Sequence, residues 1–163
     1  MGEVQKRARI TLSGVEGARV LVVDDDAASR VLLARILGMV GINDVRLEPG
    51  LRDLEQVVAS FDPGLILLDL HLGDGDGFEA LQRLEAHGAG GSSRSIVVVT
   101  GDARAETRER ALALGADEVL LKPYDVADVS RLVERRLAGR AVKEAERDAP
   151  DTTAEDDRDS SGP

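Results

Sequence analysis

Residues 19–24 read Arg-Val-Leu-Val-Val-Asp, a nearly continuous apolar run, rich in β-branched residues, that ends in an acid. Such a run is typical of a parallel strand buried on both faces of its sheet. Residues 27–40 follow as a predicted helix, which Gly41 ends in a manner common at helix C-termini. The inward face predicted for this helix consists of Leu32, Ile36, Met39 and Val40. The first unit is therefore a strand followed by a helix.

The same alternation repeats along the chain. Further strands are predicted at residues 44–48, 64–69, 95–100 and 118–121, and helices at 51–60, 78–87, 104–114 and 125–138. A Gly/Ser-rich loop is predicted at residues 88–93. The apolar residues predicted to face inward are Leu51, Leu54, Val57 and Val58, then Phe78, Leu81 and Leu84, and finally Val126, Val129, Val133 and Leu137. Five such units predict a doubly wound α/β fold, a parallel sheet with helices on both faces.

Composition limits the function. A chain of 163 residues is long enough for one domain, which we place at residues 18–138. Residues 1–17 are interpreted as a flexible N-terminal extension, and residues 139–163, with eight acids against four bases, as a disordered acidic tail. The net charge of -10 and the aromatic content of 2% argue against binding to nucleic acid or anionic membrane. Cysteine is absent, and no apolar run is long enough for a signal peptide or a membrane span, so a cytoplasmic protein is expected.

Ligands of open α/β sheets bind at the carboxyl ends of the strands. The polar residues expected there are Asp24, Asp25, Asp26, Asp69, Thr100 and Lys122. We interpret Asp26 as the N-cap of the helix that follows it. The other carboxylates repel one another, so either one of them stays protonated or a cation lies between them, and oxygen ligands favour a hard ion such as Mg²⁺. A lysine and a threonine hydroxyl at the same edge would stabilise phosphoryl oxygens, so the set suits phosphoryl transfer to a carboxylate.

Four motifs in this order resemble the signature of response-regulator receiver domains. They are Val22-Val23-Asp24-Asp25, Leu67-Leu68-Asp69 followed by Asp76-Gly77, Val99-Thr100-Gly101, and Leu121-Lys122-Pro123. The resemblance covers residues 19–138 and implies a flavodoxin-like (βα)5 fold with strand order 2-1-3-4-5. It implies a receiver that is phosphorylated by a sensor histidine kinase or a phosphotransfer protein and signals by changing shape. Such a receiver is either a stand-alone protein of the chemotaxis type or part of a longer protein. The resemblance is also compatible with a homodimer formed through the last two strand–helix units.

The resemblance implies a role for each site residue. Asp69 would accept the phosphoryl group in a reaction that the domain itself catalyses, as it would the later dephosphorylation. Asp25, Asp69 and the backbone carbonyl of His71 would bind Mg²⁺, and Asp24 would assist through a water. Thr100 and Lys122 would hold the phosphoryl oxygens, and the Lys122-Pro123 bond would be cis.

Two positions depart from the family pattern. Val119 stands where most receivers have a Tyr or Phe whose rotation is coupled to the threonine, and Gly73 stands where a proline is common. The first departure favours an alternative, a receiver-like binding module that works without phosphorylation. A third reading is a phosphohydrolase similar to the haloacid dehalogenases, with Asp69 as nucleophile. Those enzymes need a second acid where this chain has His71, which weighs against that reading.

Overall fold

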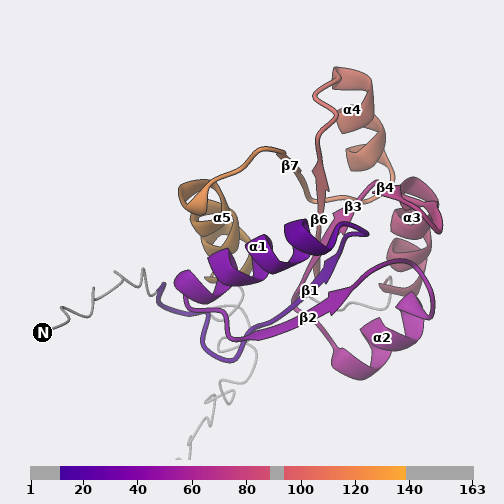
Figure 1. Cartoon of the computed structure of the whole chain (residues 1–163). Helices are drawn as coiled ribbons and strands as arrows, with labels where there is room; N and C mark the ends of the chain where they lie inside the picture. The colour runs from indigo at the N-terminus through magenta and orange to yellow at the C-terminus, as the bar shows by residue number, and fades with distance from the viewer. Residues whose placement is uncertain (1–11, 89–93, 139–163) are drawn as a thin grey trace, which may run out of the picture.

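The computed structural model describes residues 12–88 and 94–138. Five strands form one parallel sheet in the order β2-β1-β3-β6-β7, with helices on either side (Figure 1). They are β1 (Arg19–Val23), β2 (Asp44–Glu48), β3 (Leu65–Asp69), β6 (Ser95–Thr100) and β7 (Glu118–Leu121). Counted over these five strands, the order is 2-1-3-4-5, which confirms the prediction. The order reverses between β1 and β3, so their carboxyl ends mark the place where a ligand is expected.

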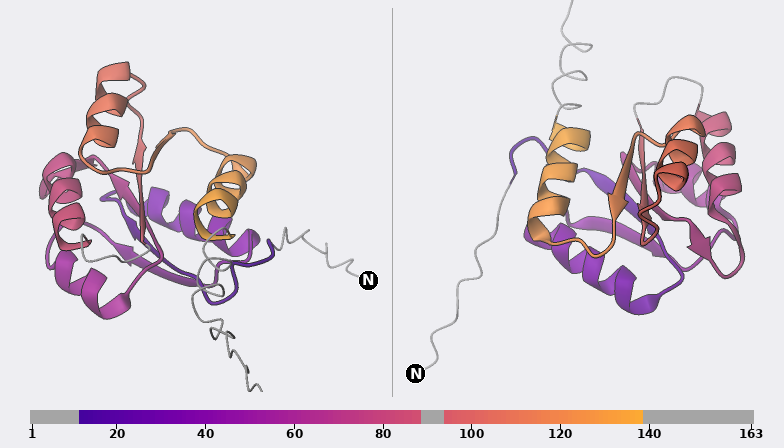
Figure 2. Two further views of the ribbon diagram at one scale, coloured as in Figure 1. Left: turned by 180° about the vertical axis from the view of Figure 1, so that it is seen from behind. Right: turned by 90° about the horizontal axis from the view of Figure 1, so that it is seen from above.

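Helices cover both faces of the sheet, which confirms the doubly wound fold (Figure 2). The helices are α1 (Ala27–Met39), α2 (Leu54–Phe61), α3 (Gly77–Gly88), α4 (Ala105–Ala113) and α5 (Val126–Val133), which continues into a π-helical turn at Glu134–Ala138. α1 and α5 pack on one face, and α2, α3 and α4 on the other. None of the helices described is long and apolar enough to cross a membrane.

Side chains of each central strand alternate between two cores, because successive residues of a strand point to opposite faces. In β1, Val20 and Val22 pack with α1 and α5, whereas Leu21 and Val23 pack with α2 and α3. All five residues of β3 are buried. The continuous apolar run in the sequence is therefore explained by a strand that is covered on both sides.

The predicted inward face of α1 is wrong in part. Leu32 is 52% exposed and Met39 is 38% exposed, whereas Leu33 and Leu37 are buried. The helix carries two overlapping apolar stripes, and Leu33 and Leu37 join Ile36 and Val40 at equally good helical spacing. Periodicity alone does not choose between the stripes, because the choice depends on how the helix docks on the sheet.

The other helices follow the predictions more closely. Leu54, Val57, Val58, Leu81 and Leu84 are buried as predicted, while Leu51 and Phe78 are partly buried against the same core. In α5 and its π-helical turn, Val129, Val133 and Leu137 are buried and Val126 is partly buried, but the equally buried Leu132 is absent from the prediction. The helix predicted from residue 51 begins at Leu54, after a turn in which the Leu54 N–H donates to the Leu51 carbonyl.

Two further features lie outside the predicted pattern. An antiparallel hairpin joins β4 (His71–Leu72) to β5 (Gly75–Asp76) directly after β3. Val15, assigned to the flexible extension, is only 3% exposed and packs in the core of α1 and α5. The packed part of the chain thus begins before residue 18. Most of the loop predicted at residues 88–93 and the whole acidic tail lie outside the described residues.

Candidate functional site

The first two of the three acids that follow β1 are held in different ways. Asp24 is buried, its Oδ1 accepts a hydrogen bond from the Asp26 N–H at 2.8 Å, and its carbonyl accepts one from the Arg30 guanidinium at 2.6 Å. Asp25 is exposed, and its Oδ2 accepts from the Gly73 N–H at 3.1 Å. One acid is therefore fixed inside the protein, and its neighbour is open to solvent.

Asp26 does not join this pair. Its Oδ1 accepts from the Ser29 N–H at 2.7 Å, which makes it the N-cap of α1. That bond is the main reason why the pKa of the Asp26 carboxyl lies below its usual value. The prediction that Asp26 caps the helix is confirmed.

Asp69 ends β3, the strand beside β1, and is 7% exposed. Its Oδ1 accepts from the His71 N–H at 2.9 Å, and its Oδ2 lies 2.9 Å from the Lys122 Nζ. Lys122 follows β7 and also donates to Oδ2 of Asp24 at 2.9 Å. One ammonium therefore bridges two buried carboxylates that come from different strands. The Lys122-Pro123 bond is cis, as predicted.

Two opposing effects act on the pKa of Lys122. Burial lowers it, because it disfavours the charged form, but the hydrogen bonds to Asp24 and Asp69 and their negative charges raise it by more. The net result is a pKa above the ordinary value of 10.5. Lys122 is therefore a permanent cation at neutral pH.

Asp24, Asp25 and Asp69 gather at one point, with one carboxylate oxygen from each lying within 4.8 Å of the others. Among these groups and Lys122, three negative charges face one positive charge, so two remain uncompensated. A set of oxygen ligands with that excess charge fits a hard divalent cation. The donor chemistry thus agrees with the Mg²⁺ site expected from the sequence.

Thr100 ends β6 and is fully buried. The residue before it, Val99, pairs with Asp69 across the two strands. The Oγ1 of Thr100 accepts a hydrogen bond from the Asp102 N–H at 3.1 Å. Because that bond uses the hydroxyl as an acceptor, its proton is left to donate to another oxygen. Its contact with a phosphoryl group stays a prediction.

His71 lies beside the cluster with its side chain exposed. Its Nδ1 lies 4.0 Å from Oδ1 of Asp69, beyond the length of a hydrogen bond. The contact that His71 does make with Asp69 is through its backbone N–H. The metal-binding role of its backbone carbonyl stays a prediction.

Val119, at the position of the usual aromatic switch, is 7% exposed and belongs to the core of α2 and α3. It already fills an inward position, so it has no counterpart to the swing of a ring between surface and interior. Tyr124 packs against the opposite core, and burial raises the pKa of its hydroxyl.

Sequence reasoning missed two groups that shape the site. Asp102 accepts from the guanidinium of Arg104 at 2.6 Å and from Oγ1 of Thr107 at 2.7 Å, and these bonds hold the loop after Thr100. The Arg104 bond is the largest cause of the strongly lowered pKa of Asp102. The polar pattern of residues 102–107 is a signal that could have indicated this loop. The Gly73 N–H that binds Asp25 leaves no such trace, since every glycine has an N–H.

Comparisons with known proteins bear directly on this geometry. The family described as the response regulator receiver domain matches residues 20–134. The chain belongs to this family. It is 39% identical over 127 residues to the swarming motility regulation protein RssB of Serratia marcescens, covering 75% of this chain and 55% of that protein. It is 34% identical over 134 residues to the phosphate regulon transcriptional regulatory protein PhoB of Escherichia coli, with 77% and 56% covered. The chain thus spans about half the length of these two relatives.

Solved structures agree with the fold. A CheY-like receiver domain protein from Methanospirillum hungatei is 28% identical and superposes with a TM-score of 0.68, over 78% of this chain and 98% of that one. The BeF3-activated receiver domain of RstA from Klebsiella pneumoniae is also 28% identical, with a TM-score of 0.65 over 73% and 97%.

Membership carries the general role of the family. Receiver domains accept a phosphoryl group from histidine kinases or phosphotransfer proteins and bind Mg²⁺ at an acidic pocket. The phosphorylation-independent module is not favoured, because the family match stands beside an assembled set of Asp24, Asp25, Asp69 and Lys122.

Proposed function

We propose that Asp69 of this chain is the phosphoacceptor. A carboxylate oxygen of Asp69 forms a bond to the phosphorus of a phosphohistidine as the bond from phosphorus to the imidazole nitrogen breaks. The imidazole nitrogen keeps the electron pair and takes up a proton from solvent, and Asp69 becomes an acyl phosphate. The observation that supports this most is the bridge from Lys122 to both buried carboxylates, because it places a fixed cation on the reacting group.

The chain's own residues have distinct parts in this step. The His71 N–H and the Lys122 ammonium orient Asp69 before the donor arrives. Lys122 then stabilises the phosphoryl oxygens, with the Thr100 hydroxyl as a second donor. A phosphoryl group adds roughly -1.5 to -2 charges, which draws Lys122 and Thr100 toward it and repacks the surface from residue 104 to 138.

A Mg²⁺ ion would be held by Asp25 and Asp69, with the His71 carbonyl as a third ligand and Asp24 acting through a water. When bound, such an ion neutralises charge on the phosphoryl oxygens and orients them for in-line displacement. The convergence of three carboxylates with two uncompensated charges supports this assignment.

The experiment is incubation with acetyl phosphate, with Mg²⁺ or with EDTA, followed by intact-mass measurement. We expect one added phosphoryl group in Mg²⁺ and none in EDTA or in Asp69→Asn. If folded Asp69→Asn protein gained a phosphoryl group to the same extent as the wild type, the acceptor would be a residue other than Asp69.

We extend the proposal to the bounds of the domain and to its partners. The receiver unit is residues 18–138, with the core extended to Val15, and the sequence that follows at residues 139–163 is rich in acidic residues. The expected phosphodonor is a sensor histidine kinase or a phosphotransfer protein in the cytoplasm. The surface built from residues 104–138 is where a protein target or a second copy would bind.

A further inference from the structure

A short path of hydrogen bonds connects the acidic site to the start of α2. Asp25 accepts from the Gly73 N–H at 3.1 Å, and the next residue, Asp74, uses its Oδ2 to accept from the Leu51 N–H at 2.8 Å. Gly73 and Asp74 form the turn between β4 and β5, and Leu51 lies just before α2. Two long-range bonds therefore meet at one turn.

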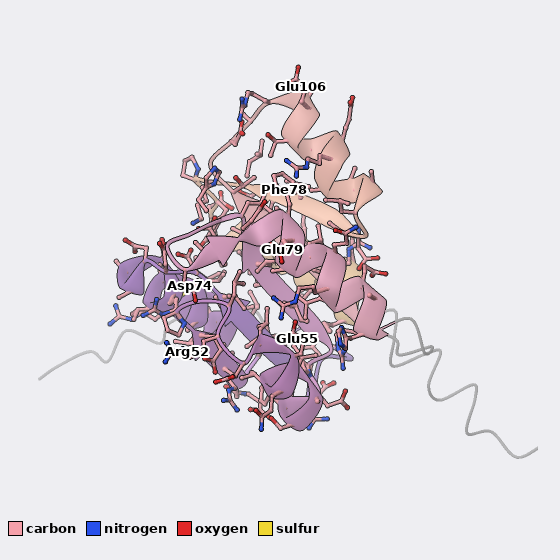
Figure 3. All side chains as sticks on the ribbon, turned by 90° about the vertical axis from the view of Figure 1, so that its right-hand side faces the viewer. Arg52, Glu55, Asp74, Phe78, Glu79 and Glu106 are labelled. Carbon is pink, nitrogen blue, oxygen red and sulfur yellow. The ribbon has the colours of Figure 1, made fainter. Side chains whose placement is uncertain are left out.

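Besides these bonds, the Leu51 side chain lies against the hairpin, since its Cδ1 would be 2.8 Å from a Cβ on Gly75, and the other contacts among the described residues are few. The β4–β5 hairpin has only two residue pairs, and of its strand residues Leu72 alone is buried. Residues 73–76 are exposed. Figure 3 shows Asp74 and Arg52 close together, where the turn meets the segment before α2. Both residues line a groove of about 800 Å³ that also reaches Asp25.

Gly50 provides the space for this contact. A Cβ on Gly50 would lie 2.3 Å from Oδ2 and 2.6 Å from Cγ of Asp74, far inside the contact distance. The backbone of Gly50 is not in the left-handed region, so glycine is not needed there for its conformation. Position 50 must lack a side chain because the Asp74 carboxylate occupies the space where a Cβ would lie.

We propose that Asp74 is a positioning residue for the metal site, an inference that rests on the proposed Mg²⁺ binding by Asp25. Asp74 holds the turn against Leu51, the turn presents the Gly73 N–H, and that N–H orients the exposed carboxylate of Asp25. Without the tie, the turn moves and Asp25 samples other orientations, so binding an ion must first order it again. Partners that orient a ligand directly are worth about 10-fold to 100-fold in metal affinity. Asp74 is one step further away, and we expect an effect of roughly 3-fold to 10-fold.

The experiment must separate the effect of the Asp74–Leu51 hydrogen bond from the effect of the negative charge that Asp74 adds near the cation. Three variants do so. Asp74→Ala removes both the charge and the acceptor, Asp74→Asn removes the charge but keeps an acceptor oxygen for Leu51, and Gly50→Ala keeps the charge but displaces the carboxylate. Gly38→Ala is the matched control for Gly50→Ala, because a Cβ there meets nothing within 4 Å.

The experiment measures two quantities in each protein. Mg²⁺ affinity comes from calorimetric titration, and solvent exchange of the Gly73 and Leu51 amides comes from NMR of the metal-free protein. We expect Asp74→Ala and Gly50→Ala to weaken Mg²⁺ binding about 3-fold to 10-fold and to speed exchange of both amides. Asp74→Asn and Gly38→Ala should stay close to the wild type. The double variant Gly50→Ala/Asp74→Ala should be no weaker than Asp74→Ala, because both changes break one tie.

Other results would overturn the proposal. Equal loss of affinity in Asp74→Ala and Asp74→Asn, with Gly50→Ala unchanged, would reduce Asp74 to a surface charge. Wild-type affinity in all variants would leave Asp74 with no part in the site. If the wild type itself bound no Mg²⁺, the proposed metal site would fail first, and the amide exchange would still show whether Asp74 holds the turn.

Discussion

The Nζ of Lys122 lies 2.9 Å from Oδ2 of Asp69, so the group proposed to take the phosphoryl is already paired with a cation before any donor arrives. The same ammonium contacts Asp24 at 2.9 Å. Lys122 thus holds both carboxylates in the unmodified protein, and under the proposed function it would redirect hydrogen bonds to the phosphoryl oxygens. The stability of the unmodified protein should report on this arrangement.

Replacing Lys122 by Met should destabilise the metal-free protein by about 1–3 kcal/mol. The change leaves two buried carboxylates without their cation, and the cost falls below the 3–5 kcal/mol of a fully buried pair because Lys122 is partly exposed. Mg²⁺ should raise the free energy of unfolding of the variant by more than it raises that of the wild type. Urea unfolding with Mg²⁺ or EDTA measures both effects, and a variant as stable as the wild type in EDTA would refute this role of the bridge.

The raised pKa of Lys122 predicts a loss of stability in alkali. Its contribution is complete below the ordinary value of 10.5 and disappears as the pH rises through the higher pKa of the folded protein. The raised pKa of Tyr124 acts in the same direction, so Tyr124→Phe is the necessary control. Unfolding midpoints above about pH 10 should fall in the wild type and in Tyr124→Phe, and less in Lys122→Met. A similar fall in Lys122→Met would assign the effect to other groups.

Phenylalanine in place of Val119 should cost about 1–3 kcal/mol, because the side chain sits in a packed core at 7% exposure. The free energy of unfolding from urea titration is the measurement. A Val119→Phe protein with wild-type stability would mean that the core has room for a ring, and so for a switch of the usual aromatic kind.

Gly77→Ala should also destabilise the protein by about 1–3 kcal/mol, although alanine is the better helix former. A Cβ on Gly77 would lie 2.5 Å from the Cα of Leu70 and 2.9 Å from the carbonyl oxygen of Asp69, and neither backbone atom can easily move. Gly101→Ala, whose Cβ meets nothing within 4 Å, should change stability by less than about 0.5 kcal/mol. Thermal melts of the two variants should separate clearly; equal melts would show that the backbone gives way at Gly77.

The sequence predicts most of this fold because its strongest signals are local. Buried parallel strands are apolar on both faces, so β1 and β3 stand out. β3 ends in Asp69, and β1 is followed at once by Asp24 and Asp25. The predicted inward face of α1 is wrong at Leu32 and Met39, because Leu33 and Leu37 are buried in their place. The docking of the helix on the sheet, rather than the periodicity, decides between the two pairs. The β4–β5 hairpin is too short for an alternating pattern, and the bond from Gly73 to Asp25 joins residues far apart in the sequence.

Chemical mapping of the modified residue distinguishes Asp69 from the neighbouring carboxylates as the phosphoacceptor. Wild-type protein is phosphorylated with acetyl phosphate in Mg²⁺, reduced with borohydride, which converts an acyl phosphate to an alcohol, and then digested for peptide mass spectrometry. We expect homoserine at position 69 and unmodified aspartate at positions 24 and 25. Homoserine at position 24 or 25, or a phosphoryl group on His71 with Asp69 intact, would contradict this expectation.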